Sequence, residues 1–320
     1  MDAPLLDVDL VLVRESARDF LTRRGQQDSL ADLAALDWLG LLVGEEFGGT
    51  GWMPVEAAVI AEELGRAGDL SAWLGGTVAA AALSTAPVEY RTQWLPRVLD
   101  GTARAAVAVA GDTVRIAGAD QVDILVTVGA DGVGVVDLST AIRCHDEDVL
   151  DVQRPVWRVS LGDSAPVRIG PPARAQELLA AAGVLLAADS VGAAAATLSR
   201  LTSHLRDRRA FGAPIASFQA VQHRLVDLLM FEVKARAIVM KAARALAGGD
   251  PQAVTLSAVA HAFVTAHATA AVDECMQLSG GIGFTWEYPL HHELRRVFTN
   301  GHLLKSVRDS RGQLAGMWGW

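Results

Sequence analysis

Residues 206–225, RDRRAFGAPIASFQAVQHRL, interrupt the long alanine-rich stretches of this 320-residue chain with a basic loop. Three arginines precede Phe211-Gly212, and Gln219 opens the helical pattern that follows. A guanidinium is a planar, permanently charged donor that suits phosphate oxygens, and glycine lets a backbone turn closely against such a group. Arginines at a helix end are also commonly a solvated cap that complements the helix dipole. The residues alone leave both interpretations open for Arg208.

A second glycine-rich stretch, QLSGGIGFTWEYPLHHELRR, covers residues 277–296. By itself Gly280-Gly281 is typical of a helix C-cap, and Gln277 is typical of a surface or packing amide. A third stretch, residues 44–68, begins with a Gly-rich turn that we interpret as structural. The tryptophans that accompany these segments, Trp52, Trp73 and Trp286, are expected to lie in the core rather than on a ligand.

The composition excludes several classes of partner. The formal net charge is −9 and the sequence has no basic run, which argues against nucleic acid or an anionic membrane surface as the main partner. The two cysteines, Cys144 and Cys275, lie far apart, and the sequence has no CxxC pair or His-rich cluster. We therefore expect no metal site and a reducing, cytoplasmic environment.

The spacing of apolar residues divides the chain into three zones. Helical spacing over residues 1–102 predicts an N-terminal all-α domain. Short β-branched runs between Gly and Asp predict a small antiparallel β domain over residues 103–172. Long helical patterns over residues 173–320 predict a C-terminal four-helix bundle. The fold class is therefore mainly α with a small β domain.

The expected helices differ in how apolar they are. The N-terminal ones cover ARDFLTRRG, LADLAALDWLGLL, PVEAAVIAEELGRAG and YRTQWLPRVL, and the C-terminal ones cover about 173–207, 217–247, 251–278 and a shorter stretch from 288 on. Residues 175–198 come nearest to a membrane span, but they include Asp189, which costs about 2.5–3.5 kcal/mol at a bilayer centre. A buried bundle helix is expected there. The acids in the first twenty residues argue against a signal peptide.

Three motifs occur in the order in which they occur in the acyl-CoA dehydrogenase family, which this sequence resembles. Residues 44–68 resemble the family's Gly-Gly-x-Gly turn and Glu-Glu-Leu-Gly-Arg-Ala helix. Residues 206–225 resemble its Arg-x-x-Phe-Gly loop with the following Phe-Gln, and residues 277–296 resemble its Gln, Gly-Gly-x-Gly-Phe, Glu-Tyr-Pro and Arg segment. Three ordered motifs over nearly the whole chain are a specific signal. The order of helices, β domain and bundle agrees with the same family.

The resemblance gives the basic loop a function. In this family the loop and the Gly-Gly turn reach across a subunit interface to the pyrophosphate and adenosine end of an FAD that the neighbouring subunit holds. Arg208 is at the position of the pyrophosphate ligand, and Phe211 forms an apolar wall beside it. The residues at the family's FAD positions are Arg208, Phe211, Gln219, Gln277, Gly280 and Gly281.

The reaction implied by the resemblance is α,β-desaturation of an acyl-CoA thioester. A carboxylate removes the α-proton while a hydride leaves the β-carbon for the flavin, and hydrogen bonds polarise the thioester carbonyl. Family members place this carboxylate at one of two positions. Counted from Gly280, the helix position is Ala266, and the loop position is Leu304 or, with a short deletion, Asn300-Gly301. None of these is an acid, so we expect no catalytic base in this chain.

The middle of the chain departs from the family in a second way. The Thr-Glu-Pro and Gly-Ser-Asp segment, which helps to cradle the isoalloxazine ring and the thioester, is missing from residues 105–128. The half that holds a flavin ring is therefore degenerate, whereas the half that contacts a neighbour's flavin tail is complete. This asymmetry resembles the small subunits of the α2β2 acyl-CoA dehydrogenases of actinobacterial steroid degradation. It implies a larger partner subunit, a steroid-derived acyl-CoA substrate and an electron-transfer flavoprotein as acceptor.

Two other interpretations remain open from the sequence. The chain could be a self-sufficient homotetrameric dehydrogenase that uses an unconventional acid such as Glu274, Glu287 or Glu293. It could also be a flavin-free scaffold that only stabilises a partner enzyme. The joint presence of Arg208 and the Gln277 turn argues against a scaffold, because folding alone does not require that set.

Overall fold

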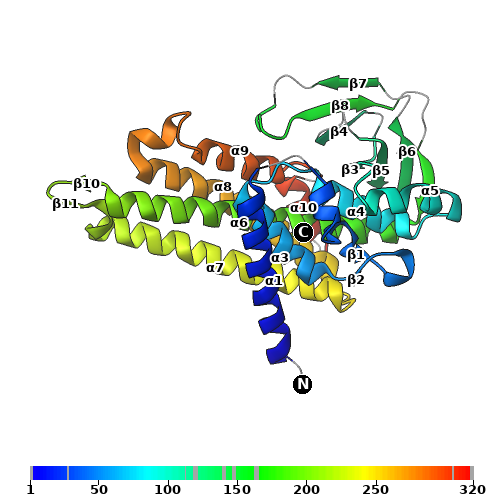
Figure 1. Cartoon of the computed structure of the whole chain (residues 1–320), viewed down its shortest axis with the longest axis horizontal. Helices are drawn as coiled ribbons and strands as arrows, with labels where there is room; N and C mark the ends of the chain where they lie inside the picture. The colour runs from blue at the N-terminus through cyan, green and yellow to red at the C-terminus, as the bar shows by residue number, and fades with distance from the viewer. Residues whose placement is uncertain are drawn as a thin grey trace.

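The computed structural model describes residues 3–26, 29–111, 113–117, 122–138, 142–145, 149–161, 166–304 and 306–317. Figure 1 shows an elongated molecule in which two small sheets lie at one end and the long bundle helices extend to the other. The order is a group of N-terminal helices, then the strands, then the bundle. This mainly α fold with a small β domain confirms the fold class expected from the sequence.

The N-terminal part is helical but more broken than its pattern predicts. Its helices are α1 (Ala3–Arg24), α2 (Ala31–Ala34), α3 (Pro54–Ala67), α4 (Trp73–Ser84) and α5 (Val88–Leu99), with short strands β1 (Leu42–Val43) and β2 (Gly51–Trp52). The single helix expected over residues 30–42 is wrong. The chain turns at Asp37, whose φ is 59°, and the indole of Trp73 donates a hydrogen bond to the Trp38 carbonyl at 3.0 Å. Tertiary contacts therefore override local helical propensity here.

The β domain consists of two small sheets. One has the order β3-β5-β6-β9 and the other β4-β8-β7. The strands are β3 (Ala105–Val109), β4 (Thr113–Ala117), β5 (Ile124–Gly129), β6 (Gly132–Asp137), β7 (Ile142–His145), β8 (Val156–Ser160) and β9 (Val167–Gly170). The described pairings are antiparallel, as expected, except that β3 and β5 are parallel. That pair differs because β4 leaves for the second sheet, and the chain then returns in its original direction.

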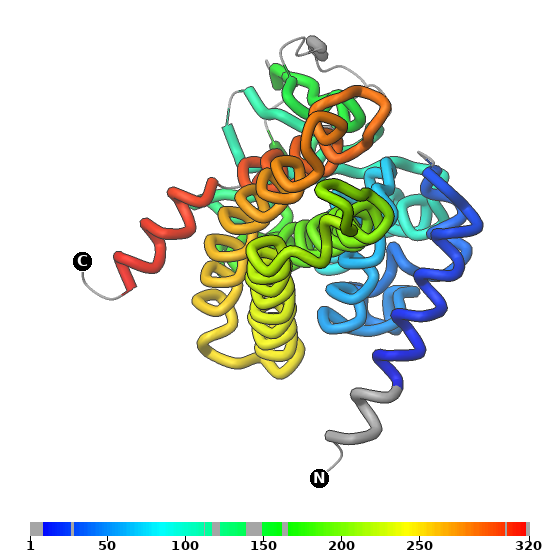
Figure 2. The backbone as a smooth tube through the Cα atoms, turned by 90° about the vertical axis from the view of Figure 1, so that its left-hand side faces the viewer, coloured from blue at the N-terminus to red at the C-terminus, as the bar shows by residue number. Residues whose placement is uncertain are grey.

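The bundle is formed by α6 (Pro172–Asp207), α7 (Gln219–Ala247), α8 (Ala253–Ser279) and α9 (Leu290–Asn300), which confirms the helices expected there. Helix α10 (Val307–Met317) follows and packs on α8. Figure 2 shows α10 and α1 on opposite sides of the bundle. The apolar centre of α6 is almost wholly buried between α3 and α8.

Small residues allow α3 and α6 to cross closely. A Cβ added to Gly192 would lie 1.8 Å from the Glu62 carbonyl oxygen, and one added to Gly65 would lie 2.0 Å from the Asp189 carbonyl oxygen. Only glycine fits at either position, because backbone atoms cannot give way. The glycine of the Glu-Glu-Leu-Gly-Arg-Ala motif is therefore a packing residue.

By length and apolar composition, α6 and the segment Ala253–Phe284 could each span a membrane. Core helices of soluble proteins meet the same two criteria. Helix α6 also carries buried Asp189, which is paired inside the fold. The hydropathy of these helices is thus weak support for a membrane location.

Candidate functional site

A two-residue hairpin projects from the end of the bundle. Strands β10 (Arg209–Ala210) and β11 (Ala213–Pro214) pair around Phe211 and Gly212, which have φ values of 52° and 82°. Turns with two positive φ values match the twist of paired strands, but a non-glycine residue costs about 1–2 kcal/mol there. Phe211 is nonetheless 98% exposed. We call this end of the bundle, shown at the left of Figure 1, the hairpin end.

Two hydrogen bonds hold the backbone of Arg208, one at its N–H and one at its carbonyl. Its N–H donates to the His204 carbonyl at 2.8 Å, and its carbonyl accepts from the Ile215 N–H at 2.9 Å. The side chain is exposed and makes no hydrogen bond or ion pair with any residue that the structure describes. A guanidinium that is anchored but unpaired can bind an external anion at a low cost in ordering.

The Gly-Gly turn begins where α8 ends, at Ser279. Gly280 has φ 70° and ψ −151°, a conformation essentially restricted to glycine. A Cβ added to Gly281 would meet no atom within 4 Å, whereas one added to Gly283 would lie 2.4 Å from the Met276 carbonyl oxygen. The fold therefore requires glycine at 283 but leaves open space at 281. Such space is what close approach by a ligand would need.

A ring contact joins the end of α6, which leads into the hairpin, to the segment that follows the Gly-Gly turn. The rings of His204, in the last turn of α6, and Tyr288 lie 6.0 Å apart. Below them, residues from α6, α7 and α8, including Leu205 and Cys275, share one apolar cluster. Figure 2, which looks onto the hairpin end, shows the α6–α7 and α8–α9 turns at the same end of the bundle. The predicted residues are thus on one surface, although they come from separate segments.

The two glutamines of the predicted site are also exposed. Gln219 is the first residue of α7, and Gln277 lies in the last turn of α8. Neither side chain hydrogen bonds with a residue in the described part of the chain. Both side-chain amides can therefore donate hydrogen bonds to, and accept them from, a molecule outside the chain.

For one aromatic residue at this end, the burial expected from the sequence is wrong. Trp286 was expected in the core but is 68% exposed. The His291 ring packs against its indole in a T-shaped contact at 4.6 Å, and the Arg295 guanidinium lies over the indole ring at 5.2 Å. An exposed Trp beside an Arg is typical of an interface anchor. Trp73, by contrast, is buried as expected.

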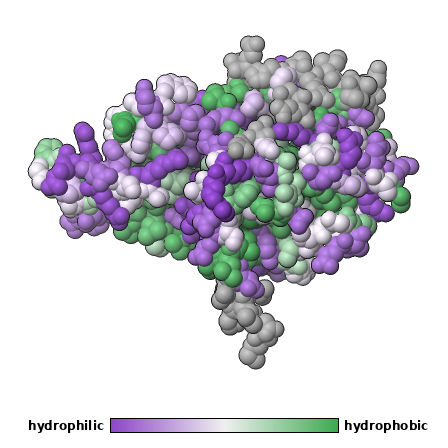
Figure 3. Space-filling view, in the orientation of Figure 1, coloured by the Kyte–Doolittle hydropathy of each residue, from purple (hydrophilic) through white to green (hydrophobic). Residues whose placement is uncertain are grey.

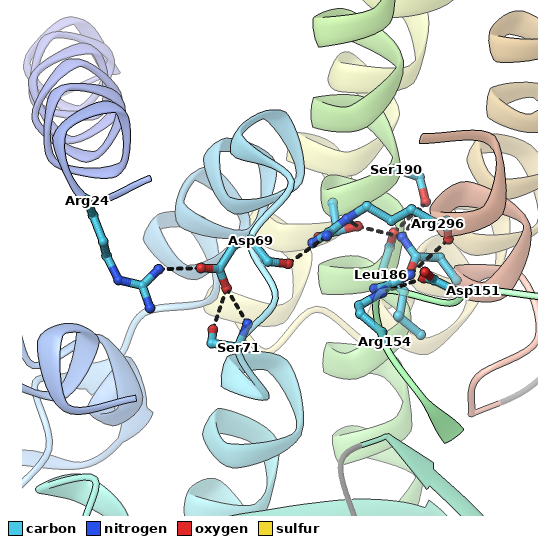
Figure 4. A network of polar contacts seen from close by, with 10 residues as sticks. Arg24, Asp69, Ser71, Asp151, Arg154, Leu186, Ser190 and Arg296 are labelled. Carbon is cyan, nitrogen blue, oxygen red and sulfur yellow. Dashed lines mark hydrogen bonds and ion pairs between the residues drawn. The ribbon is translucent and has the colours of Figure 1, made fainter. Parts of the chain in front are cut away.

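Both candidate positions of a loop base are buried and neither is an acid: Leu304 without a gap, and Asn300 if a short deletion is allowed. Asn300 donates from Nδ2 to the Asp189 carboxylate at 2.6 Å and accepts from Arg154 at Oδ1 at 3.1 Å. Arg296 binds the same Asp189 with two N–H groups, at 2.9 and 2.5 Å. It also donates to the Asp69 carbonyl at 2.6 Å, and Figure 4 shows this network between α9, α6 and the α3–α4 loop. Asn300 is therefore structural here.

The charges in this network support one another. Burial opposes the ionisation of Asp189, but Arg296 outweighs it and lowers the pKa of the carboxyl. Burial likewise lowers the pKa of Arg154, which is paired with Asp151 at 2.7 Å. Because every member is hydrogen bonded, the network can lie inside the protein without an uncompensated charge.

The edge of β3, where the family's ring-binding segment is missing, is tightly packed. The cavity where β3, α4 and α6 meet has a volume of about 70 Å³, and its lining includes Gly75, Ala106, Arg154 and Leu303. Pockets for drug-sized ligands are about 300–1,000 Å³. This cavity does not hold a flavin ring without rearrangement.

The three acids that could replace a base have different surroundings. Glu287 is exposed, and Glu274 pairs with Arg224 on the surface of the bundle at 2.6 Å. Glu293 is buried, and its nearest cation is Arg200 at 3.4 Å. Burial raises the pKa of Glu293 to about 7. It lies beside the Arg296 network rather than in an open pocket.

No metal site is formed within the described residues, where no three His, Cys, Asp or Glu side chains come together as possible ligands. Cys275 is buried in the bundle, and burial raises the pKa of its thiol to about 12. That thiol is therefore not a nucleophile at neutral pH.

Comparison with known families identifies the class of protein. Residues 11–102 match the acyl-CoA dehydrogenase N-terminal domain, and residues 173–300 match the acyl-CoA dehydrogenase C-terminal domain. The chain belongs to the acyl-CoA dehydrogenase family, whose members are FAD-dependent oxidoreductases.

Three individual proteins are similar to this chain over most of its length. The chain is 32% identical to acyl-CoA dehydrogenase IpdE2 of Mycobacterium tuberculosis over 288 residues, which cover 89% of this chain and 85% of that protein. It has the fold of the Tcur3481-Tcur3483 steroid ACAD G363A variant, with a TM-score of 0.84 and 24% identity over 98% of both chains. The ChsE4-ChsE5 complex of M. tuberculosis also matches, with a TM-score of 0.81 and 20% identity over 98% and 96% of the two chains.

Proposed function

We propose that this chain is the accessory subunit of a heteromeric FAD-dependent acyl-CoA dehydrogenase and completes the flavin site of a larger catalytic partner. The observation that carries the proposal is an asymmetry. At the hairpin end, an unpaired Arg208 and the open space at Gly281 suit a ligand from outside the chain. At the two candidate positions of a loop base, Leu304 is a buried apolar residue and Asn300 is hydrogen bonded in a buried network.

The residues of the hairpin end fit the tail of FAD. Arg208 offers paired N–H donors for the pyrophosphate, and the Gly280-Gly281 backbone has room for a phosphate to approach. The amides of Gln219 and Gln277 can hydrogen bond with the adenosine, while Phe211 forms an apolar wall beside the pyrophosphate. FAD, when bound, supplies the acceptor for the hydride that leaves the substrate's β-carbon. This chain's part is to bind and orient the cofactor.

The proposed substrate and partner are based on the solved structures that share this fold. Two matched structures are named as two-component enzymes, and one of these is named as a steroid ACAD. A steroid-derived acyl-CoA and an α2β2 assembly with a larger subunit are accordingly proposed. An electron-transfer flavoprotein as acceptor and a cytoplasmic location complete the proposal.

The two alternative functions, a self-sufficient homotetramer and a flavin-free scaffold, explain fewer of these observations. A self-sufficient homotetramer would need an acid beside a bound flavin ring, but the acids considered lie on the surface or beside the Arg296 network. A flavin-free scaffold would not need glycine at 281, because a side chain fits there.

Replacement of Arg208 tests the proposal. Arg208→Ala in the co-expressed complex should weaken FAD binding about 10- to 100-fold, because a charge-assisted hydrogen bond contributes about 1.5–3 kcal/mol. Folding of the chain, and with it assembly, should be largely unchanged, since the Arg208 side chain makes no hydrogen bond or ion pair with a described residue of its own chain. FAD affinity is measured by titration of the deflavinated complex, and size-exclusion chromatography with light scattering measures assembly.

Arg209→Ala is the matched control, because Arg209 is adjacent and its Nη2 donates to the Gly212 carbonyl at 3.4 Å. It removes the same charge from the hairpin. Equal losses in the two variants would indicate a general electrostatic effect. Full FAD affinity in Arg208→Ala would remove this arginine from the flavin site.

A further inference from the structure

A groove of about 470 Å³ lies between the C-terminal half of α6 and the N-terminal half of α7, and Arg66 of α3 also lines it. Pockets for drug-sized ligands have volumes of about 300–1,000 Å³, so this groove is large enough for a small molecule. Its α6 side is polar, with side chains three or four positions apart on one face of the helix: Ser199, Thr202, Ser203 and Arg206. In Figure 3, hydrophobic surface lies along the lower edge of the long helices, where Figure 1 draws α7, with hydrophilic surface above it.

A cluster of ion pairs beside the groove contains more arginines than glutamates. Four arginines and three glutamates meet where α1, α3 and α7 pack together: Arg14, Arg18, Arg66 and Arg236 with Glu62, Glu63 and Glu232. Each glutamate accepts a hydrogen bond of 2.8–3.0 Å from an arginine other than Arg66. The cluster therefore has one positive charge in excess, and Arg66 is the arginine that the glutamates do not hydrogen bond.

The guanidinium of Arg66 makes no hydrogen bond within the described part of the chain. Its Nε is buried and lies 3.7 Å from the Glu63 carboxylate, which is too far for a hydrogen bond. Burial lowers the pKa of Arg66, although Glu63, Glu62 and Glu232 act in the opposite direction. A largely buried cation with too few acceptors is expected to bind an anion. The side chain is 23% exposed and lines the groove, so an anion can reach it from there.

Other donors on the α6 side of the groove are free as well. Arg206 is exposed and makes no hydrogen bond or ion pair with a described residue. The hydroxyls of Ser199 and Ser203 likewise have no hydrogen-bond partner among the described residues. Guanidinium groups with hydroxyl donors between them suit the oxygens of a carboxylate or a phosphate.

The acids near the groove do not cancel this preference. Glu232 is the acid in the described lining, and it pairs with Arg236 at 2.8 Å. Asp207 is exposed at the end of α6 and is not part of the lining, and Asp227 lines the neighbouring groove between α7 and α8. The lining thus carries two arginines against one glutamate that is already paired.

The α7 side of the groove is apolar. It is formed by Leu225, Val226 and Leu229, and Leu198 of α6 adds to it. Val226 and Leu229 are 56% and 51% exposed. Covering such side chains with an aliphatic group is favourable by about 0.8 kcal/mol for each buried methylene. A ligand that uses both sides of the groove has an anionic head and an aliphatic body.

We propose that the groove between α6 and α7 binds a small organic anion, whose carboxylate or phosphate contacts Arg66 and Arg206 and whose aliphatic body lies on Leu225 and Leu229. None of the residues at the family's FAD positions is among the described residues that line the groove. The inference therefore does not depend on the proposed function.

The first test measures binding of octanoate, which combines a carboxylate with an aliphatic chain. Isothermal titration calorimetry is performed on the flavin-loaded complex of this chain with its larger subunit. Octanoate should bind at least about tenfold more tightly than acetate, because its chain buries more apolar surface, and more tightly than uncharged 1-octanol. Octyl phosphate, measured in parallel, shows which head group is preferred. Equal affinity for octanoate and 1-octanol would contradict an anion site.

Substitution of the arginines locates the site. Arg66→Met and Arg206→Met should each weaken octanoate binding about 10- to 100-fold, because a hydrogen bond to a charged group contributes about 1.5–3 kcal/mol. Arg308→Met is the matched control, since Arg308 is exposed on α10 and does not line the groove. Unchanged octanoate affinity in Arg66→Met and Arg206→Met would mean that octanoate binds elsewhere in the complex, and the proposal would be overturned.

The stability of the ligand-free complex provides an independent check. Arg66→Met should lower the thermal unfolding midpoint less than Arg18→Met does, because Arg18 donates two hydrogen bonds to Glu63 whereas Arg66 donates none to a described residue. An equal or larger loss in Arg66→Met would show that Arg66 serves the ion-pair cluster rather than a ligand, and would overturn the proposal.

Discussion

Gly281 and Gly283 differ in what an added methyl group would meet. At 283 it would lie against the Met276 carbonyl, whereas at 281 it would point into open space. We predict that Gly281→Ala leaves the thermal unfolding midpoint of the complex unchanged but weakens FAD binding about tenfold, because the methyl group occupies the ligand's approach. Gly283→Ala should instead lower the unfolding midpoint. Lower stability with normal FAD affinity in Gly281→Ala would show that the glycine is structural.

Glu293 makes the stability of the fold depend on pH. Its folded pKa of about 7 lies above the usual value of 4.5 because the carboxyl is buried, so the folded state binds a proton more tightly than the unfolded state. The resulting stability is fully present below about pH 4.5 and is lost as pH rises through 7. The charged groups facing it are Arg296, Arg200, Asp189 and Arg154.

Glu293→Gln should remove this dependence, because glutamine does not ionise. We expect the free energy of unfolding of the parent to fall by up to about 3 kcal/mol between pH 5 and pH 8 relative to the variant. Thermal unfolding midpoints of the two complexes across this range provide the measurement. Parallel pH profiles for parent and variant would contradict the assigned pKa.

At the scale of elements, motifs and amphipathic patterns allow good predictions. Elements that lack such a pattern are missed. The bundle helices were found because they are long, including α6 with its buried centre, but the 12-residue α4 was missed because Trp73, Val78 and Leu83 lie among residues that are apolar all round. Such a helix has no period to detect. The residues of the proposed FAD site could be named from motifs, whereas the exposure of Trp286 depends on how α8 ends and α9 begins. The role of Asn300 depends on Asp189, more than one hundred residues away.

The network around Asp189 holds three elements together, so its loss should destabilise the fold. Arg296→Met should lower the free energy of unfolding by about 3–5 kcal/mol, because it leaves Asp189 buried with fewer partners. Arg295→Met is the control, since Arg295 makes an exposed contact with the Leu150 carbonyl. Denaturant unfolding of the complexes measures the difference. A loss below 1 kcal/mol for Arg296→Met would mean that the remaining hydrogen bonds suffice.

At the scale of the molecule, the hairpin end and the β-domain end of the fold differ in what they expose. At the hairpin end, Arg208, Phe211 and the Gly-Gly turn are exposed, and we propose that they bind a ligand outside the chain. At the opposite end, the cavity that the described residues form where β3 meets α4 has a volume of about 70 Å³. A family built around a shared flavin can divide its site in this way, provided that a second chain supplies the ring pocket and the base.

The flavin content of this chain, purified alone and purified with the larger subunit, tests that division most directly. The account predicts that the chain alone carries no flavin absorbance and is poorly soluble, because the hairpin end and exposed apolar residues such as Val226, Met230 and Val233 lack their partner. The complex should contain FAD in proportion to the copies of this chain. A soluble homotetramer of this chain alone, loaded with FAD and able to desaturate an acyl-CoA, would contradict the account.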